Sequence, residues 1–298
     1  MKKYNKVVIW GLRTQKHTHA YIHQSFYKGF VKIGANVVWV DDEVENQSVI
    51  QKNDFVIAVN VANKNLPPLE DVYYCLHNFD DDFASSLADS RIVNLQVYTN
   101  RSEENSVKWD ESTFFDAKEK ILYQAWGTDL FEEEFYEPVN KSWFKVCFWV
   151  GSIWNNELNQ GNVAEITEFK RVLARKKIKF IHLHHISDYL NVLFTRNSRI
   201  APAISGKWQV INNYLPCRMF KNISYGQLGI SNVKKFNILF GPELSVQGAT
   251  IEELVDNALS LSNSQRKEMI RGQQEIVKKH TYAHKINNIL KAFEKLSS

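Results

Sequence analysis

The amino-acid sequence predicts an α/β protein built from two Rossmann-like domains. Short, continuous runs of β-branched and aromatic residues alternate with helix-length segments, which is the pattern of parallel strands covered by helices on both faces. After an acidic segment that ends at Pro138, the same alternation starts again. The chain has 298 residues, which is long enough for two domains with separate cores.

The first half of the chain alternates predicted strands with helical segments. An apolar face at helical spacing lies between the first two strands and ends at Gly34. Ligands of parallel sheets bind beyond the carboxyl ends of the strands, so we expect the polar residues that follow the strands to converge on a site. The predicted strands are residues 7–10, 37–40, 55–59, 72–76, 92–97 and 121–123.

Residues 131–138 are acidic and end in proline, a composition that predicts a linker. Beyond it we expect strands at residues 145–149 and 178–183, with a helix between them and a short strand at 200–203. Two helices close the chain. The first begins with a capping box at Thr250. The second carries an apolar stripe after His280 that comprises Ile286, Ile289, Leu290, Phe293 and Leu296.

The stretch from Pro216 to Gly226 predicts a short helix with a polar face. Met219, Phe220 and Ile223 recur at helical spacing and form its apolar face. Helix N-termini favour anions, because their backbone N–H groups are unpaired and the helix dipole is positive there. The basic and amide side chains of this stretch therefore suit a phosphate group.

Composition narrows the functional classes. The hydrophobic share of 44% and the charged share of 23% are those of an ordinary globular protein. No apolar run is long enough to span a bilayer, and no signal peptide is evident. The odd number of widely spaced cysteines, Cys75, Cys147 and Cys217, indicates no disulfide framework and no metal site, so we expect a cytoplasmic protein.

The charge and glycine patterns give no direct support to two further classes, nucleic-acid-binding proteins and dehydrogenases. The net charge of +4 is too small to indicate nucleic acid as a partner, although it is compatible with an anionic substrate such as a nucleotide sugar. Only Gly11 follows the first predicted strand, so the Gly-x-Gly-x-x-Gly fingerprint of dinucleotide-binding proteins is absent. The sequence therefore does not predict a dehydrogenase.

The stretch from Arg218 to Gly226 resembles the Arg-Ile-Phe-Glu-x-x-Ala-x-Gly signature of GT-B glycosyltransferases, most closely that of the group that includes CgeB-like proteins. Other segments agree with this resemblance in order and spacing. Residues 149–154 look like the first turn of a donor domain, and residues 125–129 look like the x-Gly-x-Asp passage that ends the first domain. Residues 280–284 look like the start of the last helix. One position departs from the pattern, because Lys221 stands where many relatives carry an acidic residue.

The resemblance implies a GT-B fold, with an acceptor-binding domain at residues 1–137 and a donor domain at 138–279. Residues 280–298 would form a helix that packs back on the first domain. The implied reaction is transfer of a sugar from a nucleotide-diphosphate sugar to a hydroxyl of a glycan or glycoconjugate. The resemblance implies neither a metal nor another cofactor.

Candidate donor-binding residues lie in the second half of the chain. Gly151 would let the backbone approach a diphosphate closely, and Ser152 could hydrogen-bond to it. Arg218 and Lys221 would offset the charge of the departing diphosphate, a catalytic role for Arg218. Two further polar side chains of the same stretch are expected to contact the ribose or the sugar: Asn222 and Ser224.

Candidate acceptor-side residues follow the first-half strands. Transfer to a hydroxyl benefits from a general base that titrates near neutral pH, and His19 or His17 is our candidate. His77 and Asp80 are candidates for acceptor contacts. His23 lies inside the predicted helix, and we expect it to be structural.

Two other functions stay open at this point. The chain could be a catalytically silent protein that binds a sugar or nucleotide, which the replacement of the usual acidic residue by Lys221 favours. It could also be a sugar transferase that acts on modified DNA, as in some phages, although no stripe of Lys and Arg is evident. Peripheral contact with a membrane is a further open possibility.

Overall fold

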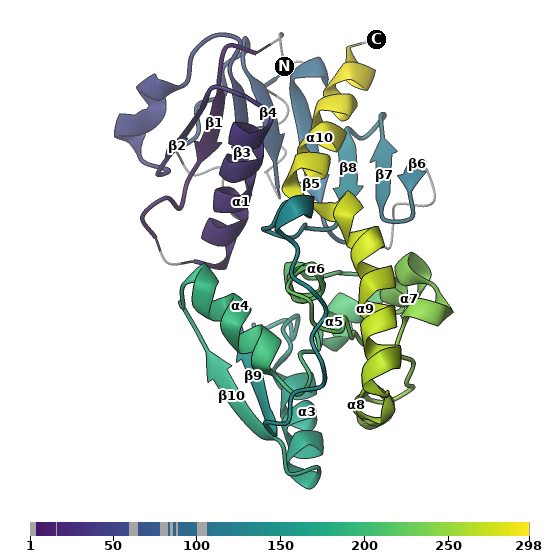
Figure 1. Ribbon diagram of the computed structural model, residues 1–298. Coiled ribbons are helices and arrows are strands. Elements are labelled where there is room, and N and C mark those ends of the chain that lie inside the picture. Colours follow the sequence, from purple (N-terminus) through teal and green to yellow (C-terminus); the bar gives the residue numbers. More distant parts are fainter. Residues whose placement is uncertain are drawn as a thin grey trace. The chain divides into compact units, whose positions relative to one another are not determined.

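A computed structural model describes residues 4–15, 17–59, 65–77, 83, 86–87, 89–99 and 106–297. The chain divides into two compact units (Figure 1). Unit 1 comprises Met1–Gln124 and Tyr282–Ser298, and unit 2 comprises Ala125–Thr281. Unit 2 is therefore one continuous piece of chain inserted into unit 1. Residues 125–137, which the predicted boundary places in the first domain, belong to unit 2.

Unit 1 is built on an eight-stranded sheet with the order β2-β1-β3-β4-β5-β8-β7-β6. Neighbouring strands from β2 to β8 are parallel, and the last two pairings are antiparallel. The central strands are buried along their whole length, as their continuous apolar runs predict. The strands are β1 Val7–Trp10, β2 Val37–Val40, β3 Phe55–Ala58, β4 Tyr73–Leu76, β5 Ile92–Gln96, β6 Val107–Asp110, β7 Thr113–Asp116 and β8 Ile121–Gln124.

Helices α1 (Thr18–Lys32) and α10 (Tyr282–Leu296) pack against each other beside this sheet (Figure 1). Helix α1 contacts β1 and β2, whereas α10 contacts β5 and β8. Gly29 makes the close approach of the two helices feasible, because a Cβ atom there would lie 2.7 Å from Ile286 Cδ1. The last helix thus completes unit 1, as the resemblance implies. Two short 3-10 helices, η1 Val44–Val49 and η2 Asp89–Arg91, link strands of this unit.

The β6–β7 hairpin is a feature that the sequence analysis does not predict. Its turn is closed by Asp110, whose Oδ1 accepts hydrogen bonds from the backbone N–H of Ser112 over 2.7 Å and from Ser112 Oγ over 3.1 Å. Strand β6 is largely exposed and mixes charged with aromatic residues. It therefore lacks the continuous apolar run by which the other strands are recognised.

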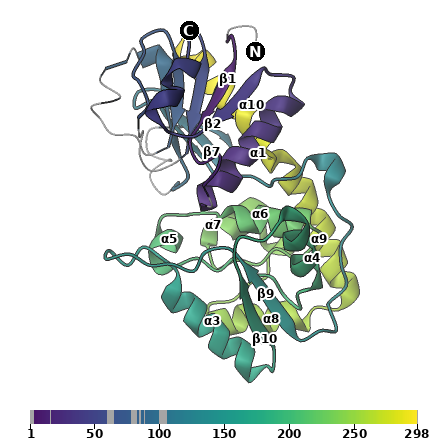
Figure 2. The ribbon, with the colours of Figure 1, turned by 90° about the vertical axis from the view of Figure 1, so that its left-hand side faces the viewer.

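Unit 2 contains a two-stranded parallel sheet of β9 (Val146–Val150) and β10 (Lys179–Leu183), as the sequence predicts (Figure 2). Helix α3 (Val163–Arg175) connects them and buries its apolar face against the sheet and α8. The expected strand at 200–203 forms only a single parallel bridge, between Ala203 and Ser231. The other helices are α4 Asp188–Asn197, α5 Lys207–Ile211, α6 Cys217–Ser224, α7 Lys234–Phe240, α8 Ile251–Ser260 and α9 Asn263–Val277, with 3-10 helices η3 Glu132–Glu134, η4 Pro242–Leu244 and η5 Lys278–His280.

The acidic segment at residues 131–138 is held against unit 2 by hydrogen bonds. The backbone N–H of Tyr136 donates to the Ser224 carbonyl over 2.9 Å, and the amide of Gln274 donates to the Tyr136 carbonyl over 2.8 Å. Just upstream, the Thr128 N–H donates to the His280 carbonyl over 3.0 Å. The segment is therefore an integral part of unit 2.

Candidate functional site

Helix α6 presents Arg218 to the end of strand β9. Pro216 precedes the helix, and no side chain caps its first turn. Met219, Phe220 and Ile223 are buried, as their spacing predicts, and they anchor one face of α6 in a hydrophobic core. This anchoring leaves Arg218 on the opposite side, next to Val150.

The guanidinium of Arg218 is fixed by two contacts. Its Nε atom donates a hydrogen bond to the Val150 carbonyl over 2.9 Å. Its Cζ atom lies 3.8 Å from the centroid of the Trp149 ring, a cation–π contact. Burial lowers the pKa of Arg218 to about 10, so the group is still charged at neutral pH.

Arg218 has no carboxylate partner among the residues that the structure describes. A partly buried charge is costly unless an opposite charge accompanies it. The arrangement is therefore suited to an anionic ligand that would supply the missing charge.

Gly151 ends β9 and lies directly against Arg218. Its backbone φ angle of +121° is one that residues other than glycine rarely adopt. A Cβ atom at this position would overlap Nη2 of Arg218. The Gly151 carbonyl accepts a hydrogen bond from His182 Nε2 over 2.7 Å, and its N–H donates to the Leu183 carbonyl over 3.2 Å. The turn is thus fixed on both sides, with the half-buried Ser152 directly after it.

Histidines gather at the carboxyl end of β10. Because a carbonyl can only accept, the bond to Gly151 places a proton on Nε2 of His182. Burial lowers the pKa of His182. The ring of His184 lies 3.8 Å from that of His182, centroid to centroid. His182 is therefore a positioning residue for the Gly151 turn.

Lys221, one turn further along α6, is paired with Asp129. The distance from its Nζ to Asp129 Oδ2 is 2.9 Å, and both side chains are largely buried. The hydroxyl of Tyr225 also lies 2.7 Å from Asp129 Oδ2. Burial works against the charged form of Lys221, but the attraction of Asp129 outweighs it and raises the Lys221 pKa. Burial and the charge of Asp129 also raise the pKa of Tyr225.

Asn222 and Ser224 are buried and hydrogen-bonded inside unit 2. The amide of Asn222 donates to the Ala201 carbonyl over 2.6 Å. Ser224 Oγ lies 2.7 Å from Thr128 Oγ1 and donates to the Lys221 carbonyl over 2.9 Å. These hydrogen bonds hold α6 in place, and we therefore do not assign Asn222 and Ser224 to the donor site.

In unit 1, the structure brings three of the predicted histidines together. The rings of His17 and His19 lie 5.1 Å apart, and those of His19 and His77 lie 6.3 Å apart, measured between centroids. Nδ1 of His17 accepts a hydrogen bond from the His19 N–H over 3.2 Å and so caps α1. His77 is buried and donates from Nδ1 to the Leu95 carbonyl over 2.7 Å. Asp80 lies outside the described residues.

His19 is held neutral. Burial, together with the neighbouring His77 and His17, lowers the pKa of His19 to about 4. Its Nδ1 atom is buried without a hydrogen-bond partner. His23, by contrast, uses both ring nitrogens, since Nδ1 donates to the Gly11 carbonyl over 2.9 Å and Nε2 accepts from the Val59 N–H over 2.9 Å. This bonding matches the structural role that we expect for His23.

We expect acid to destabilise unit 1 through these histidines. Burial lowers the pKa of His23 to about 3 from an ordinary value of 6.5. Between these values the unfolded chain binds more protons than the folded chain, so stability is complete above pH 6.5 and declines as the pH falls. The melting temperature should therefore drop between pH 7 and pH 5, and it should drop less in His23→Gln. An equal drop in both proteins would contradict this assignment.

Three residues that shape the unit 2 site have no role predicted from the sequence. Asp129 stands in the segment that resembles the x-Gly-x-Asp passage, and this was the available signal for it. Trp149 directly precedes the predicted turn, where an aromatic ring can support a cation. Tyr225 precedes Gly226 and has no local pattern that predicts its bond to Asp129, which lies 96 positions away.

Two kinds of feature are absent from the described residues. No group of three or more His, Cys, Asp or Glu side chains is arranged to hold a metal ion in the part of the chain that the structure describes. Within the same residues, the helices lack the length and apolar character that crossing a membrane requires.

Known proteins resemble this chain in structure and not in sequence. No protein-family model matches the sequence, and no curated protein matches it. An α-glucosyltransferase solved in complex with UDP and a 13-mer DNA containing a HMU base aligns with a TM-score of 0.66 at 9% identity, over 98% of this chain and 99% of that chain. The trehalose-6-phosphate synthase OtsA aligns with a TM-score of 0.57 at 10% identity, over 98% of this chain and 99% of that chain.

A third similar structure is the DNA-modifying enzyme β-glucosyltransferase. It aligns with a TM-score of 0.56 at 14% identity, over 97% of this chain and 99% of that chain. These alignments extend over nearly the whole chain, and at such identities they establish the fold. The chain has the GT-B glycosyltransferase fold, as its sequence predicts.

Proposed function

We propose that this protein is a glycosyltransferase that moves a sugar from a nucleotide-diphosphate sugar to a hydroxyl of a glycan or glycoconjugate. Arg218 is the observation that carries the proposal, because it is a fixed cation without a carboxylate partner among the described residues. A departing nucleoside diphosphate develops negative charge, which a preorganised cation stabilises. The fold supports the proposal, since similar structures contain UDP or are described with uridine diphosphoglucose as substrate.

On the donor side, we assign the diphosphate to Arg218, Gly151 and Ser152. Gly151 lets the guanidinium of Arg218 lie directly against the backbone turn, and Ser152 can donate a hydrogen bond. Lys221 is paired with Asp129, so its contribution is to hold α6 in place beside the site. Reaction without a metal ion is part of the proposal, because the leaving group's charge would be met by Arg218 and by backbone N–H groups.

On the acceptor side, we assign the general base to His19. Its imidazole is neutral at pH 7, and its Nδ1 atom has no hydrogen-bond partner. A pKa of about 4 makes His19 a weaker base than an ordinary histidine. The acceptor hydroxyl would therefore transfer its proton to His19 late in the reaction, as the acceptor oxygen bonds to the sugar. His17 caps the helix that carries His19, and His77 packs beside it. Asp80 remains a proposed acceptor contact.

A DNA hydroxyl is the second candidate acceptor. One of the similar structures is described as a DNA-modifying β-glucosyltransferase, and another, an α-glucosyltransferase, was solved in complex with DNA. A cytoplasmic location fits either acceptor and agrees with the free cysteines Cys75, Cys147 and Cys217. Salt-sensitive binding to duplex DNA would favour this candidate over a glycan acceptor.

A thermal-shift panel with UDP, GDP, ADP, CMP and dTDP, with and without magnesium, tests the donor assignment. A ligand at about 100 times its dissociation constant stabilises by roughly 2.7 kcal/mol, which raises the melting temperature by a few degrees. We expect one diphosphate to produce this shift whether or not magnesium is present. Hydrolysis of the matching sugar nucleotide would then exclude a catalytically silent binding protein. No shift with any nucleotide would contradict the proposed function.

A further inference from the structure

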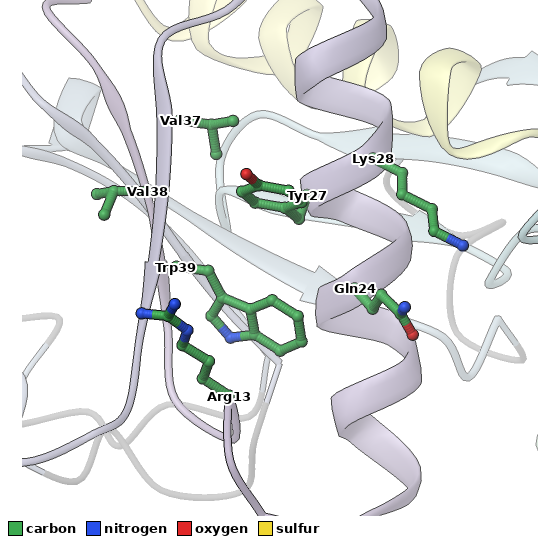
Figure 3. Close-up of a pocket in the computed structure, with 7 residues that line it drawn as sticks. All are labelled: Arg13, Gln24, Tyr27, Lys28, Val37, Val38 and Trp39. Carbon is green, nitrogen blue, oxygen red and sulfur yellow. The ribbon is translucent and has the colours of Figure 1, made fainter. Parts of the chain in front are cut away.

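A pocket of about 430 Å³ lies within unit 1 between helix α1 and the edge strand β2 (Figure 3). Figure 3 shows side chains from both elements, and from the segment after β1, arranged around it. The lining residues are Arg13, Gln24, Tyr27, Lys28, Val37, Val38 and Trp39. None of the residues that we assign to glycosyl transfer belongs to this set.

Two aromatic rings form one wall of the pocket. Trp39 Nε1 donates a hydrogen bond to the Gly11 carbonyl over 2.9 Å, which sets the orientation of the indole. The ring of Tyr27 lies 6.2 Å from that of Trp39, centroid to centroid, at an interplanar angle of 36°. Both rings are partly exposed. Partly exposed aromatic rings offer an apolar face on which the ring of a ligand can stack.

The polar lining is cationic. Arg13 and Lys28 each carry a positive charge, and no carboxylate is among the lining residues. Arg13 is exposed and forms no ion pair among the residues that the structure describes. Gln24 adds an amide that can both donate and accept hydrogen bonds, as hydroxyl groups require. The pocket thus combines an apolar wall, a site for hydroxyls and a site for an anion.

The surroundings favour a small ligand over a long polyanion. Strand β2 runs directly into Asp41, Asp42 and Glu43, and Glu45 follows in η1. These carboxylates repel a chain of phosphates that extends beyond the pocket.

We propose that this pocket binds a single sugar residue that carries a phosphate or carboxylate group. The C–H face of the sugar would stack on Trp39, its hydroxyls would bond to Gln24, and its anionic group would pair with Arg13. The volume lies in the range of small-molecule sites. The site goes beyond the proposed function, since it requires neither the donor nor transfer.

Isothermal titration of the full chain with four probes tests this proposal: glucose 6-phosphate, glucuronic acid, glucose and hexathymidylate. At least one of the two anionic sugars should bind, and glucose should bind about tenfold more weakly or not at all. The stronger of the two anionic sugars identifies the charged group. Failure of both to bind would overturn the proposal, and so would tighter binding of the oligonucleotide, which would indicate a nucleic-acid site.

Variants locate the binding. Arg13→Gln should weaken binding of the anionic sugar about tenfold, and Trp39→Leu should weaken it as well. Lys118→Gln, which changes an exposed lysine elsewhere in unit 1, is the matched control and should bind like the wild type. Arg218→Ala should also bind the anionic sugar normally, whereas Arg13→Gln should keep the thermal shift with the nucleoside diphosphate. Wild-type affinity in Arg13→Gln would overturn the assignment, whatever the outcome for the donor site.

Discussion

Arg218→Ala should lower the rate of sugar transfer or donor hydrolysis by at least about 10²-fold, the loss typical of removing a group that stabilises developing charge. The same variant should lose the thermal shift with the nucleoside diphosphate. Arg218 is the cation that lies against Gly151, and its stacking on Trp149 fixes it in advance. Removing it leaves the charge of the leaving group without a fixed partner.

Two further variants make the Arg218 result specific. Arg218→Lys should rescue little, because an ammonium group cannot reproduce both the stacking and the bond to Val150. Arg175→Ala removes an exposed arginine of unit 2 that pairs with Glu252, and it should leave activity unchanged. Near-normal turnover in folded Arg218→Ala would refute the assigned role.

Asp129→Ala should destabilise unit 2 by about 3–5 kcal/mol, because it strands a largely buried Lys221 charge. It also removes the acceptor to which the Tyr225 hydroxyl bonds, at 2.7 Å and 2.9 Å from the two carboxylate oxygens. The loss should appear as a lower urea midpoint and as faster hydrogen exchange of the α6 amides. We expect this loss of stability to be the largest that a single substitution causes in unit 2.

A second-site variant and an exposed pair serve as controls for Asp129. Adding Lys221→Met to Asp129→Ala should recover much of the stability, since the uncompensated charge is then absent. Asp256→Ala breaks the more exposed pair with Lys176 and should cost less than about 1 kcal/mol. Equal losses in the free energy of unfolding in Asp129→Ala and Asp256→Ala would show that the Asp129–Lys221 pair stabilises the protein no more than an exposed pair does.

The sequence predicts those parts of the fold that local patterns determine. Continuous apolar runs identify the parallel strands β1 to β5, most clearly β1, β3 and β4, because both faces of these three strands are covered. The spacing of Met219, Phe220 and Ile223 predicts α6 and, with it, the opposite side of the helix on which the half-buried Arg218 lies. The sequence predicts that another group approaches Gly151 closely, but it does not predict that this group is the guanidinium of Arg218.

What escapes prediction depends on pairings between distant residues. Asn222 and Ser224 look like ligand-binding side chains in sequence, yet their partners Ala201 and Thr128 lie far along the chain and bury them. In the same way, Lys221 looks like a free cation until Asp129 is brought beside it. No local sequence pattern reveals these contacts. Spacing alone therefore cannot separate ligand-binding polar residues on a helix face from polar residues that hold the structure together.

The insertion of unit 2 into unit 1 reverses the expected order of assembly during synthesis. Domains generally fold from the N-terminus as the chain emerges. Here α10, which packs on α1, β5 and β8, is made only after the whole of unit 2. Unit 2 can therefore close while the sheet of unit 1 still exposes the apolar surface that Ile286, Ile289 and Phe293 later cover. A chain that ends before Tyr282 would carry a finished unit 2 attached to an open, aggregation-prone sheet.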